Sequence, residues 1–276
     1  MPWSPARLLH AAALLLLGAA CNVLAAAPLR IVLPAVHPSS QEHAAYFPRL
    51  LRLALDHTAA TDGPFEIVHY DQPLTSPRQA IELKNNGIIN VMWDGSNQQR
   101  EAELLPIRIS LLRQLNDYRV FLIRAEDAPK FGAITTLGQL RALGAGSGVN
   151  WPSTEVLRAN GLKVVTSIAY EYLFPMLAAK RFDYMPRGVY EAWYEQRAHA
   201  DQQLVIEQTI FLHYPVPFYF FVSRSNPKLA ARIERGLQLS QRDGSFDKLF
   251  NSFPAFQRSE AEIAAGKRRV FELRLP

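Results

Sequence analysis

The chain has 276 residues, of which 49% are hydrophobic, 20% charged and 11% aromatic, values that are typical of globular proteins and exclude disordered or collagen-like sequences. Its Lys and Arg residues exceed its Asp and Glu residues by only five, and the one tight basic cluster is Lys267-Arg268-Arg269. A nucleic-acid-binding protein normally gathers its basic residues into a stripe, so nucleic acid is not expected as a partner.

The first 27 residues have the layout of a secretory signal peptide. Arg7 supplies the positive charge, Leu8 to Ala20 form an apolar run, and small residues at 25–27 offer the cleavage site. The apolar run is shorter than the roughly 20 residues that span a bilayer. We therefore expect an exported, periplasmic protein. The sequence GAAC that ends at Cys21 is an imperfect lipobox, because it lacks the usual leucine, so a lipoprotein anchored at Cys21 is the lesser alternative.

Hydrophobic periodicity predicts alternating strands and helices over the rest of the chain, with Pro, Gly and Asn or Asp at their ends. In chain order we expect a strand over 29–36, a helix over 46–60, a strand over 65–70, a helix over 77–86 and strands over 88–93 and 118–123. The second series comprises helix 137–143, a glycine-rich turn or short strand over 144–148, helix 153–160, strand 164–166, helix 171–179, strand 182–185, helix 189–196, strands 204–211 and 217–222, and helices 227–241 and 246–250.

This alternation predicts an α/β fold with mostly parallel sheets flanked by helices. Two series of strands and helices in about 250 mature residues indicate two lobes. The motifs of serine hydrolases, zinc proteases and P-loop proteins are missing, and no two histidines lie four residues apart on a predicted helix, so neither a cofactor nor a metal is expected. Glu191 and Glu195 lie four residues apart, which is more typical of a solvated helix face than of an active site.

Four stretches of the sequence follow the order and spacing of one family's motifs. The first runs from Asp94 to Ile107 and contains Arg100, where the family has T-x-x-R; the others are 134–148, 178–184 and 220–246. From Trp93 onward the chain therefore resembles the family 3 periplasmic solute-binding proteins, the amino-acid-binding class with the type II periplasmic-binding-protein fold.

The resemblance implies two α/β lobes joined by two crossing segments, with a ligand held in the cleft between them. The first lobe would comprise 28–112 and 217–276, and the second lobe 113–216. The implied function is an exported, monomeric solute-binding protein that passes a small polar ligand, either anionic or amino-acid-like, to a membrane transporter permease, as in ABC systems, without catalysis.

Two alternatives to a transport function remain open. One is a module that senses the ligand for a separate membrane receptor. The other is an enzyme of the dehydratase kind on the same scaffold. Such an enzyme would need a cleft carboxylate, such as Asp94 or Glu191, as a general base with a raised pKa.

The resemblance assigns Arg100 to the carboxylate of the ligand. A guanidinium group forms a bidentate, charge-assisted pair with a carboxylate, although a surface arginine is the simpler alternative. Trp93 and Asp94 end the preceding predicted strand, so both are expected to face the cleft. Trp93 would then form an apolar wall, but it is equally suited to the core.

Trp151, Ser153 and Thr154 open a predicted helix of the second lobe. Family members offer hydroxyl and backbone N–H groups to the ligand at this turn, and a helix N-terminus favours an anion. Capping of the helix by Ser153 is an equal alternative. Tyr184 belongs to a group of tyrosines that are expected near the cleft side of this lobe, although such aromatic residues equally suit its core.

Arg187 departs from the family pattern, because amino-acid-binding members commonly carry an Asp there that holds the ammonium group of the ligand. A cation at this position would repel an ammonium group and attract a second acid group, so we expect a dicarboxylate or another anionic ligand. An ion pair between Arg187 and Glu191 that touches no ligand is an equal alternative. Arg119 follows the first crossing and is expected either in a hinge salt bridge or in contact with the ligand.

Overall fold

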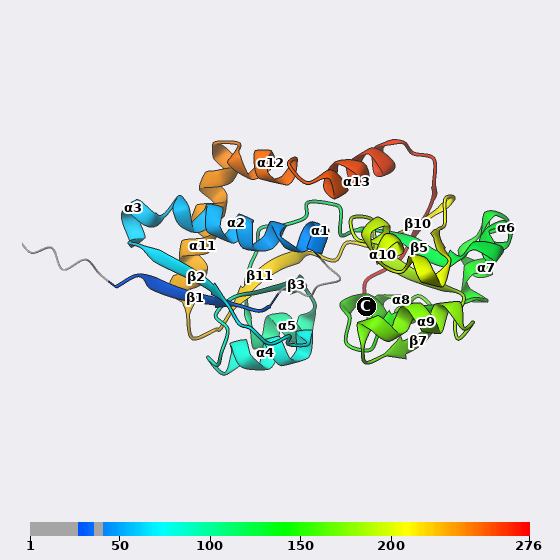
Figure 1. Ribbon diagram of the computed structural model, residues 1–276, viewed down its shortest axis with the longest axis horizontal. Helices are drawn as coiled ribbons and strands as arrows, with labels where there is room; N and C mark the ends of the chain where they lie inside the picture. Colours follow the sequence, from blue (N-terminus) through cyan, green and yellow to red (C-terminus); the bar gives the residue numbers. More distant parts are fainter. Residues whose placement is uncertain (1–26, 36–40) are drawn as a thin grey trace, which may run out of the picture.

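The computed structural model describes residues 27–35 and 41–276. The predicted signal peptide, apart from its last residue Ala27, and the lipoprotein alternative at Cys21 lie outside these residues. The described chain forms two α/β lobes, which lie side by side in Figure 1. The two-lobed α/β fold expected from the sequence is confirmed.

The first lobe contains two small sheets. Its β1 pairs in parallel with β2, whereas β11 runs antiparallel between β3 and β4. Its strands are β1 (Leu29–Leu33), β2 (Phe65–His69), β3 (Met92–Gly95), β4 (Leu105–Ile107) and β11 (Phe218–Val222). Its helices are α1 (Gln41–Ala44), α2 (Tyr46–Asp56), α3 (Ala59–Asp62), α4 (Ser76–Lys84), α5 (Gln98–Glu103), α11 (Pro227–Arg242) and α12 (Ser245–Phe250).

The second lobe is built on one larger sheet with the strand order β12-β10-β5-β8-β6-β7, to which β9 adds by pairing with β5. Its strands are β5 (Tyr118–Arg124), β6 (Gly144–Gly148), β7 (Lys163–Ser167), β8 (Tyr184–Gly188), β9 (Leu204–Ile206), β10 (Ile210–His213) and β12 (Arg269–Glu272). Its helices are α6 (Ala128–Gly132), α7 (Leu137–Arg141), α8 (Pro152–Ala159), α9 (Leu173–Ala178) and α10 (Ala192–Ala198), with short 3-10 turns at Ala125–Asp127, Tyr170–Tyr172 and Ala200–Gln202.

The strand expected over 204–211 is interrupted in the structure. The carboxylate of Glu207 accepts hydrogen bonds from the backbone N–H groups of Thr209 and Ile210, at 2.7 and 2.8 Å. These local bonds turn the backbone out of the ladder, so β9 ends before Glu207 and β10 begins after it.

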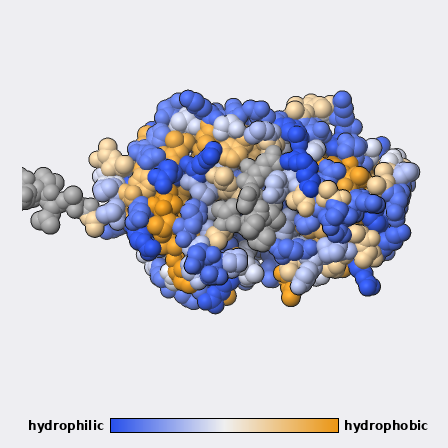
Figure 2. Space-filling view, viewed as in Figure 1, coloured by the Kyte–Doolittle hydropathy of each residue, from blue (hydrophilic) through white to orange (hydrophobic). Residues whose placement is uncertain are grey.

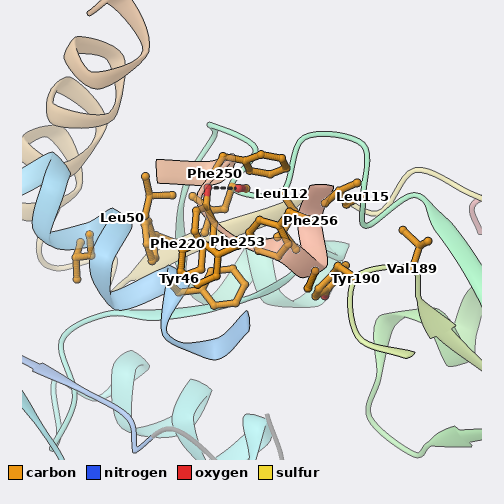
Figure 3. Packing of buried hydrophobic residues seen from close by; sticks show 14 of the residues in the cluster. Tyr46, Leu50, Leu112, Leu115, Val189, Tyr190, Phe220, Phe250, Phe253 and Phe256 are labelled. Carbon is orange, nitrogen blue, oxygen red and sulfur yellow. Dashed lines mark hydrogen bonds between the residues drawn. The ribbon is translucent and has the colours of Figure 1, made fainter. Parts of the chain in front are cut away.

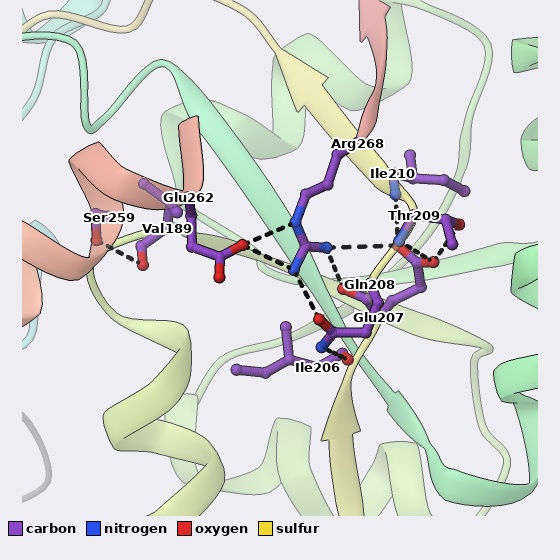
Figure 4. Close-up of polar contacts among 9 residues, drawn as sticks. All are labelled: Val189, Ile206, Glu207, Gln208, Thr209, Ile210, Ser259, Glu262 and Arg268. Carbon is purple, nitrogen blue, oxygen red and sulfur yellow. Dashed lines mark hydrogen bonds and ion pairs between the residues drawn. The ribbon is translucent and has the colours of Figure 1, made fainter. Parts of the chain in front are cut away.

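The C-terminal strand β12 lies in the second lobe, whereas the sequence placed all of 217–276 in the first. It runs parallel to β10, from Arg269 opposite Ile210 to Glu272 opposite His213. The buried Arg268 holds this strand in place by donating to the carbonyl of Glu207 and pairing with Glu262 at 3.4 Å (Figure 4). Within the described residues the chain therefore crosses between the lobes at 108–117, at 214–217 and again at 265–268.

One cluster of buried hydrophobic residues extends through both lobes, and residues of helix α13 (Pro254–Ala264) belong to it (Figure 3). Tyr46 of α2 is fully buried against Phe256 of α13, with ring centroids 4.8 Å apart, and its hydroxyl donates to the carbonyl of Leu111 at 2.8 Å. Tyr190 of the second lobe also packs on Phe256, at 6.2 Å. Phe256 therefore contacts side chains of both lobes next to the crossing segments.

Polar and charged residues cover most of the face seen in Figure 2, and apolar residues gather in smaller areas. Among the residues that the structure describes, no helix combines the length and the apolar character needed to cross a membrane.

Helices α2 and α11 approach each other closely at Gly236. A Cβ atom added to Gly236 would lie only 1.8 Å from the carbonyl oxygen of Ala54 in α2. Any larger residue there has to push the two helices apart, and these helices carry much of the first lobe's core.

We therefore predict that Gly236→Ala lowers the free energy of unfolding by roughly 1–3 kcal/mol, the usual cost of overpacking a core. Urea-induced unfolding measures this change. Gly138→Ala in α7 is the matched control, because its added Cβ meets nothing closer than 3.7 Å. Equal unfolding midpoints for the two variants would contradict the close approach of α2 and α11.

Candidate ligand-binding site

A cavity of about 220 Å³ lies between the two lobes, next to the crossing segments. Ligands of open α/β folds usually bind in such clefts, beyond the ends of the strands. The lining residues come from the end of β3, the end of β8 and the residues that follow it, the starts of β5, α8 and β11, and both of the first two crossings. They are Asp94, Gly95, Asn116, Arg119, Trp151, Pro152, Ser153, Pro186, Arg187, Tyr190, Glu191, Val216 and Phe218.

Arg100 is held by groups of the first lobe itself. Asn97 caps α5 by accepting a hydrogen bond from the backbone N–H of Arg100 at 2.8 Å, which sets the start of the helix. The guanidinium then pairs with Asp94 at 2.9 Å, donates to Ser76 Oγ at 3.2 Å and donates to the carbonyl of Gly95. Arg100 borders a neighbouring cavity of about 380 Å³, and its charge is balanced by Asp94 instead of being left for the expected ligand carboxylate.

Arg187 is enclosed by two glutamates. Its Nε and Nη2 atoms donate to the two carboxylate oxygens of Glu195 at 2.7 and 2.6 Å, and Nη2 lies 3.0 Å from the carboxylate of Glu191. The guanidinium also lies 4.6 Å from the centre of the Trp151 ring. Of the two alternatives for Arg187, the structure contains the ion pair with Glu191. It adds Glu195, which is only 3% exposed and not on a solvated face.

These opposite charges keep the groups ionised. Burial acts to lower the pKa of Arg187, but the charges of Glu191 and Glu195 outweigh it and hold the pKa well above its usual value. Burial acts to raise the pKa of Glu191, but Arg187, His43 and Arg119 outweigh it and hold the pKa below its usual value. A general base of the dehydratase alternative would need a raised pKa, which is the opposite of what Glu191 has.

The more exposed charges at the cleft are carboxylates. The side chains of Asp94 and Glu191 are 22% and 19% exposed, whereas those of Arg100 and Arg187 are 9% and 10% exposed. The expected anionic ligand depended on these two arginines, and both are neutralised within the protein. The cavity instead receives one partly exposed carboxylate from each lobe.

Aromatic rings surround the same two carboxylates in an adjoining cavity of about 250 Å³, which Asp94 and Glu191 also line. Trp93 borders this cavity and stacks on Phe47, with ring centroids 5.4 Å apart. Phe218 borders both this cavity and the 220 Å³ cavity, and its ring centroid lies 5.3 Å from that of Phe47, on which it stacks. Aromatic rings attract cations, so both the aromatic walls and the two carboxylates favour a positively charged group of a ligand.

Two of the expected ligand contacts are buried inside the second lobe instead. Tyr184 is fully buried on Phe121, with ring centroids 4.7 Å apart, because it begins β8 at the end away from the cavity. Thr154 is also buried, and its hydroxyl donates to the carbonyl of Gly148 at 2.6 Å and lies 2.7 Å from the hydroxyl of Ser147. Both residues pack the lobe and do not line the cleft.

The other expected residues, Trp93, Asp94, Trp151, Ser153 and Arg187, all border the cavities between the lobes. Sequence reasoning missed the part played by Glu195. The available signal was an arginine and two glutamates within nine residues, directly after a predicted strand. No group of three or more His, Cys, Asp or Glu side chains that could hold a metal ion occurs in the described part of the chain.

Removal of the Glu195 charge should destabilise the protein. We predict that Glu195→Gln lowers the free energy of unfolding by about 3 kcal/mol, because it leaves Arg187 buried with only part of its counter-charge. Urea-induced unfolding at neutral pH measures the loss. Glu126→Gln is the control, since Glu126 pairs with Lys180 at 2.7 Å on the exposed surface, and it should leave the midpoint unchanged. Similar midpoints for both variants would contradict a buried ion pair at Arg187.

The Glu191 carboxylate should make stability depend on pH. Its pKa is lower in the folded than in the unfolded chain, so its stabilisation is present above the unfolded value of about 4.3 and is lost as the pH falls through the lower folded value. The difference in unfolding free energy between wild type and Glu191→Gln should therefore stay constant from pH 6 down to the unfolded value of about 4.3 and shrink as the pH is lowered further. A difference that stays constant down to the lowest pH at which the protein folds would refute this prediction.

Comparisons with known proteins match the fold. No protein-family model and no curated protein matches the sequence. An ancestral arginine-binding protein bound to arginine superposes with a TM-score of 0.61 and 15% identity, over 82% of this chain and 98% of that one. An arginine-specific periplasmic binding protein of Salmonella typhimurium has a TM-score of 0.60 and 12% identity, over 82% and 99% of the two chains. A histidine kinase sensor domain similar to periplasmic binding proteins has a TM-score of 0.60 and 15% identity, over 82% and 96%. The chain therefore has the two-lobed fold of the type II periplasmic binding proteins.

Proposed function

We propose that this chain is an exported, periplasmic solute-binding protein that holds a small amine-bearing ligand between its lobes. The observation that carries the proposal is the pair of partly exposed carboxylates, Asp94 from the first lobe and Glu191 from the second, on one cavity. An ammonium group between them is attracted by both lobes, so its binding favours the closed arrangement over an open one.

The size and walls of the cavity support the same class of ligand. About 220 Å³ is less than the roughly 300–1,000 Å³ of pockets for drug-sized molecules, which suits a compound of the size of an amino acid. The aromatic residues around Asp94 and Glu191 add cation–π attraction. Two of the structurally similar proteins are arginine-binding proteins, and arginine is a cationic amino acid.

The membrane partner follows from the proposed role. A monomer that binds and releases its ligand without chemistry would deliver it to a transporter permease, as in ABC systems. A second candidate role is sensing, in which the loaded protein contacts a membrane receptor; the similarity to a histidine kinase sensor domain supports it. Copurification of a permease or of a receptor with the ligand-loaded protein would distinguish delivery from sensing.

A thermal-shift screen of the purified protein tests the proposed ligand class. The panel comprises amino acids, simple amines, dicarboxylates and sugars. An amine-bearing compound at 100 times its dissociation constant should stabilise the protein by about 2.7 kcal/mol. Stabilisation by dicarboxylates or sugars alone, or by no compound of the panel, would overturn the proposal.

Variants connect the binding to the two carboxylates. In calorimetric titrations at neutral pH, Glu191→Gln and Asp94→Asn should each weaken binding of the stabilising amine by about tenfold or more, since each removes one charge-assisted contact. Glu126→Gln is the matched control, because it also removes one carboxylate but on the exposed surface of the second lobe. An unchanged affinity in both cleft variants would show that the amine binds elsewhere.

A further inference from the structure

Arg119 is a buried cation at the cleft without a carboxylate partner among the described residues. It lies at the start of β5, is only 6% exposed and lines the 220 Å³ cavity. Its Nη1 atom donates to the carbonyls of Asn116 and Tyr118, and Nη2 donates to the side-chain oxygen of Asn116 at 3.3 Å. The hinge salt bridge that was one alternative for Arg119 is not formed.

This environment differs from that of Arg187 and Arg268. Arg187 pairs with Glu195, and Arg268 pairs with Glu262. The buried Arg232 of α11 also donates only to neutral acceptors, on Thr58, Asp62 and Gly63, but Arg119 in addition lines the 220 Å³ cavity between the lobes. Arg119 has only neutral acceptors and the ring of Tyr214, whose centre lies 4.9 Å from its guanidinium carbon. Neutral acceptors reduce the cost of burying a charge but do not balance it. The three hydrogen bonds also leave part of the planar, five-donor guanidinium group available for another acceptor.

We propose that Arg119 receives the carboxylate of the ligand in this cleft, the role that the sequence resemblance assigned to Arg100. Arg100 is less suited to this role, because the carboxylate of Asp94 lies 2.9 Å from its guanidinium and already balances its charge. Ser153 supplies a second donor: its hydroxyl borders the same cavity and makes no hydrogen bond within the described residues. A planar guanidinium group binds a carboxylate through two parallel hydrogen bonds.

The position of Arg119 also prepares it for this contact. The side-chain oxygen of Asn116 accepts hydrogen bonds from Arg119 and from the hydroxyl of Tyr190, the latter at 3.4 Å. The side-chain nitrogen of Asn116 donates to the carbonyl of Val216 in the second crossing at 2.7 Å. The guanidinium is therefore oriented by groups from both crossing segments before a ligand arrives, which reduces the entropy that binding has to overcome.

The inference rests on the proposed function and makes it more specific. An ammonium group between Asp94 and Glu191, together with a carboxylate on Arg119, requires a zwitterion in one small cavity. Arg119, Asp94 and Glu191 all line this cavity, and no ion pair joins Arg119 to either carboxylate. The favoured class of ligand is an amine that also carries a carboxylate, as amino acids do, rather than a simple amine or a dicarboxylate.

Paired probes test the role of Arg119. Calorimetric titrations of the wild-type protein compare arginine with agmatine, lysine with cadaverine, histidine with histamine and tyrosine with tyramine; each second compound lacks only the carboxylate. For the pair that binds, the amino acid should bind about tenfold or more tightly than its amine. Arg119→Gln should remove this preference by weakening the amino acid, with little effect on the amine.

A matched variant and a second substitution keep the test decisive. Arg100→Gln also removes a cleft arginine but should retain the preference for the amino acid. Arg119→Lys keeps the charge, should retain part of the preference, and replaces Arg119→Gln if thermal melting shows that variant to be unfolded. Two results would overturn the role of Arg119 and leave the proposed function intact. One is that Arg100→Gln loses the preference for the amino acid while the Arg119 variant retains it. The other is that the wild-type protein binds the amine and the amino acid equally well. Failure of every amine-bearing probe to bind would instead overturn the proposed function.

Discussion

A guanidinium group that is shielded from water needs a counter-charge or hydrogen-bond acceptors inside the protein, and this requirement organises the cleft. Arg187 takes both oxygens of Glu195 and one of Glu191, which ties β8 to α10. Arg100 takes Asp94, which ties α5 to β3. Because the arginines lie deeper and Asp94 and Glu191 lie partly exposed, the most accessible charges of the cleft are carboxylates, although the whole chain carries a net charge of +5.

The two lobes are held together by side-chain contacts as well as by the crossing segments. Phe256 contacts Tyr46 of the first lobe and Tyr190 of the second. Ser259 of the same helix donates to the carbonyl of Val189 at 3.0 Å, and the chain then crosses again to add β12 to the second sheet. These contacts add to the crossing segments in holding the two lobes together.

Three arginines of similar burial thus have different chemical roles at one cleft. Arg100 and Arg187 orient carboxylates that balance their charge, whereas Arg119 donates its hydrogen bonds only to neutral groups and lies over an aromatic ring. The number of arginines near a cleft is therefore a poor guide to its ligand. The charge that remains after internal pairing is the relevant quantity. Asp94 and Arg100 balance each other, the two glutamates exceed Arg187 by one negative charge, and Arg119 adds a positive charge without an ion pair among the described residues.

The sequence by itself determined the alternation of strands and helices, the two-lobed fold and the pairing option between Arg187 and Glu191, because periodicity and short spacings act over a few residues. Only the tertiary structure decided three other features: that β12 lies in the second lobe, that Glu195 is buried, and that Arg100 pairs with Asp94. A four-residue strand carries little pattern of its own, and β12 is set by its pairing with β10, some 60 residues earlier. Whether an arginine binds the protein or a ligand depends on which carboxylates the fold brings within about 3 Å of it, and that distance is a property of packed elements rather than of the order of residues.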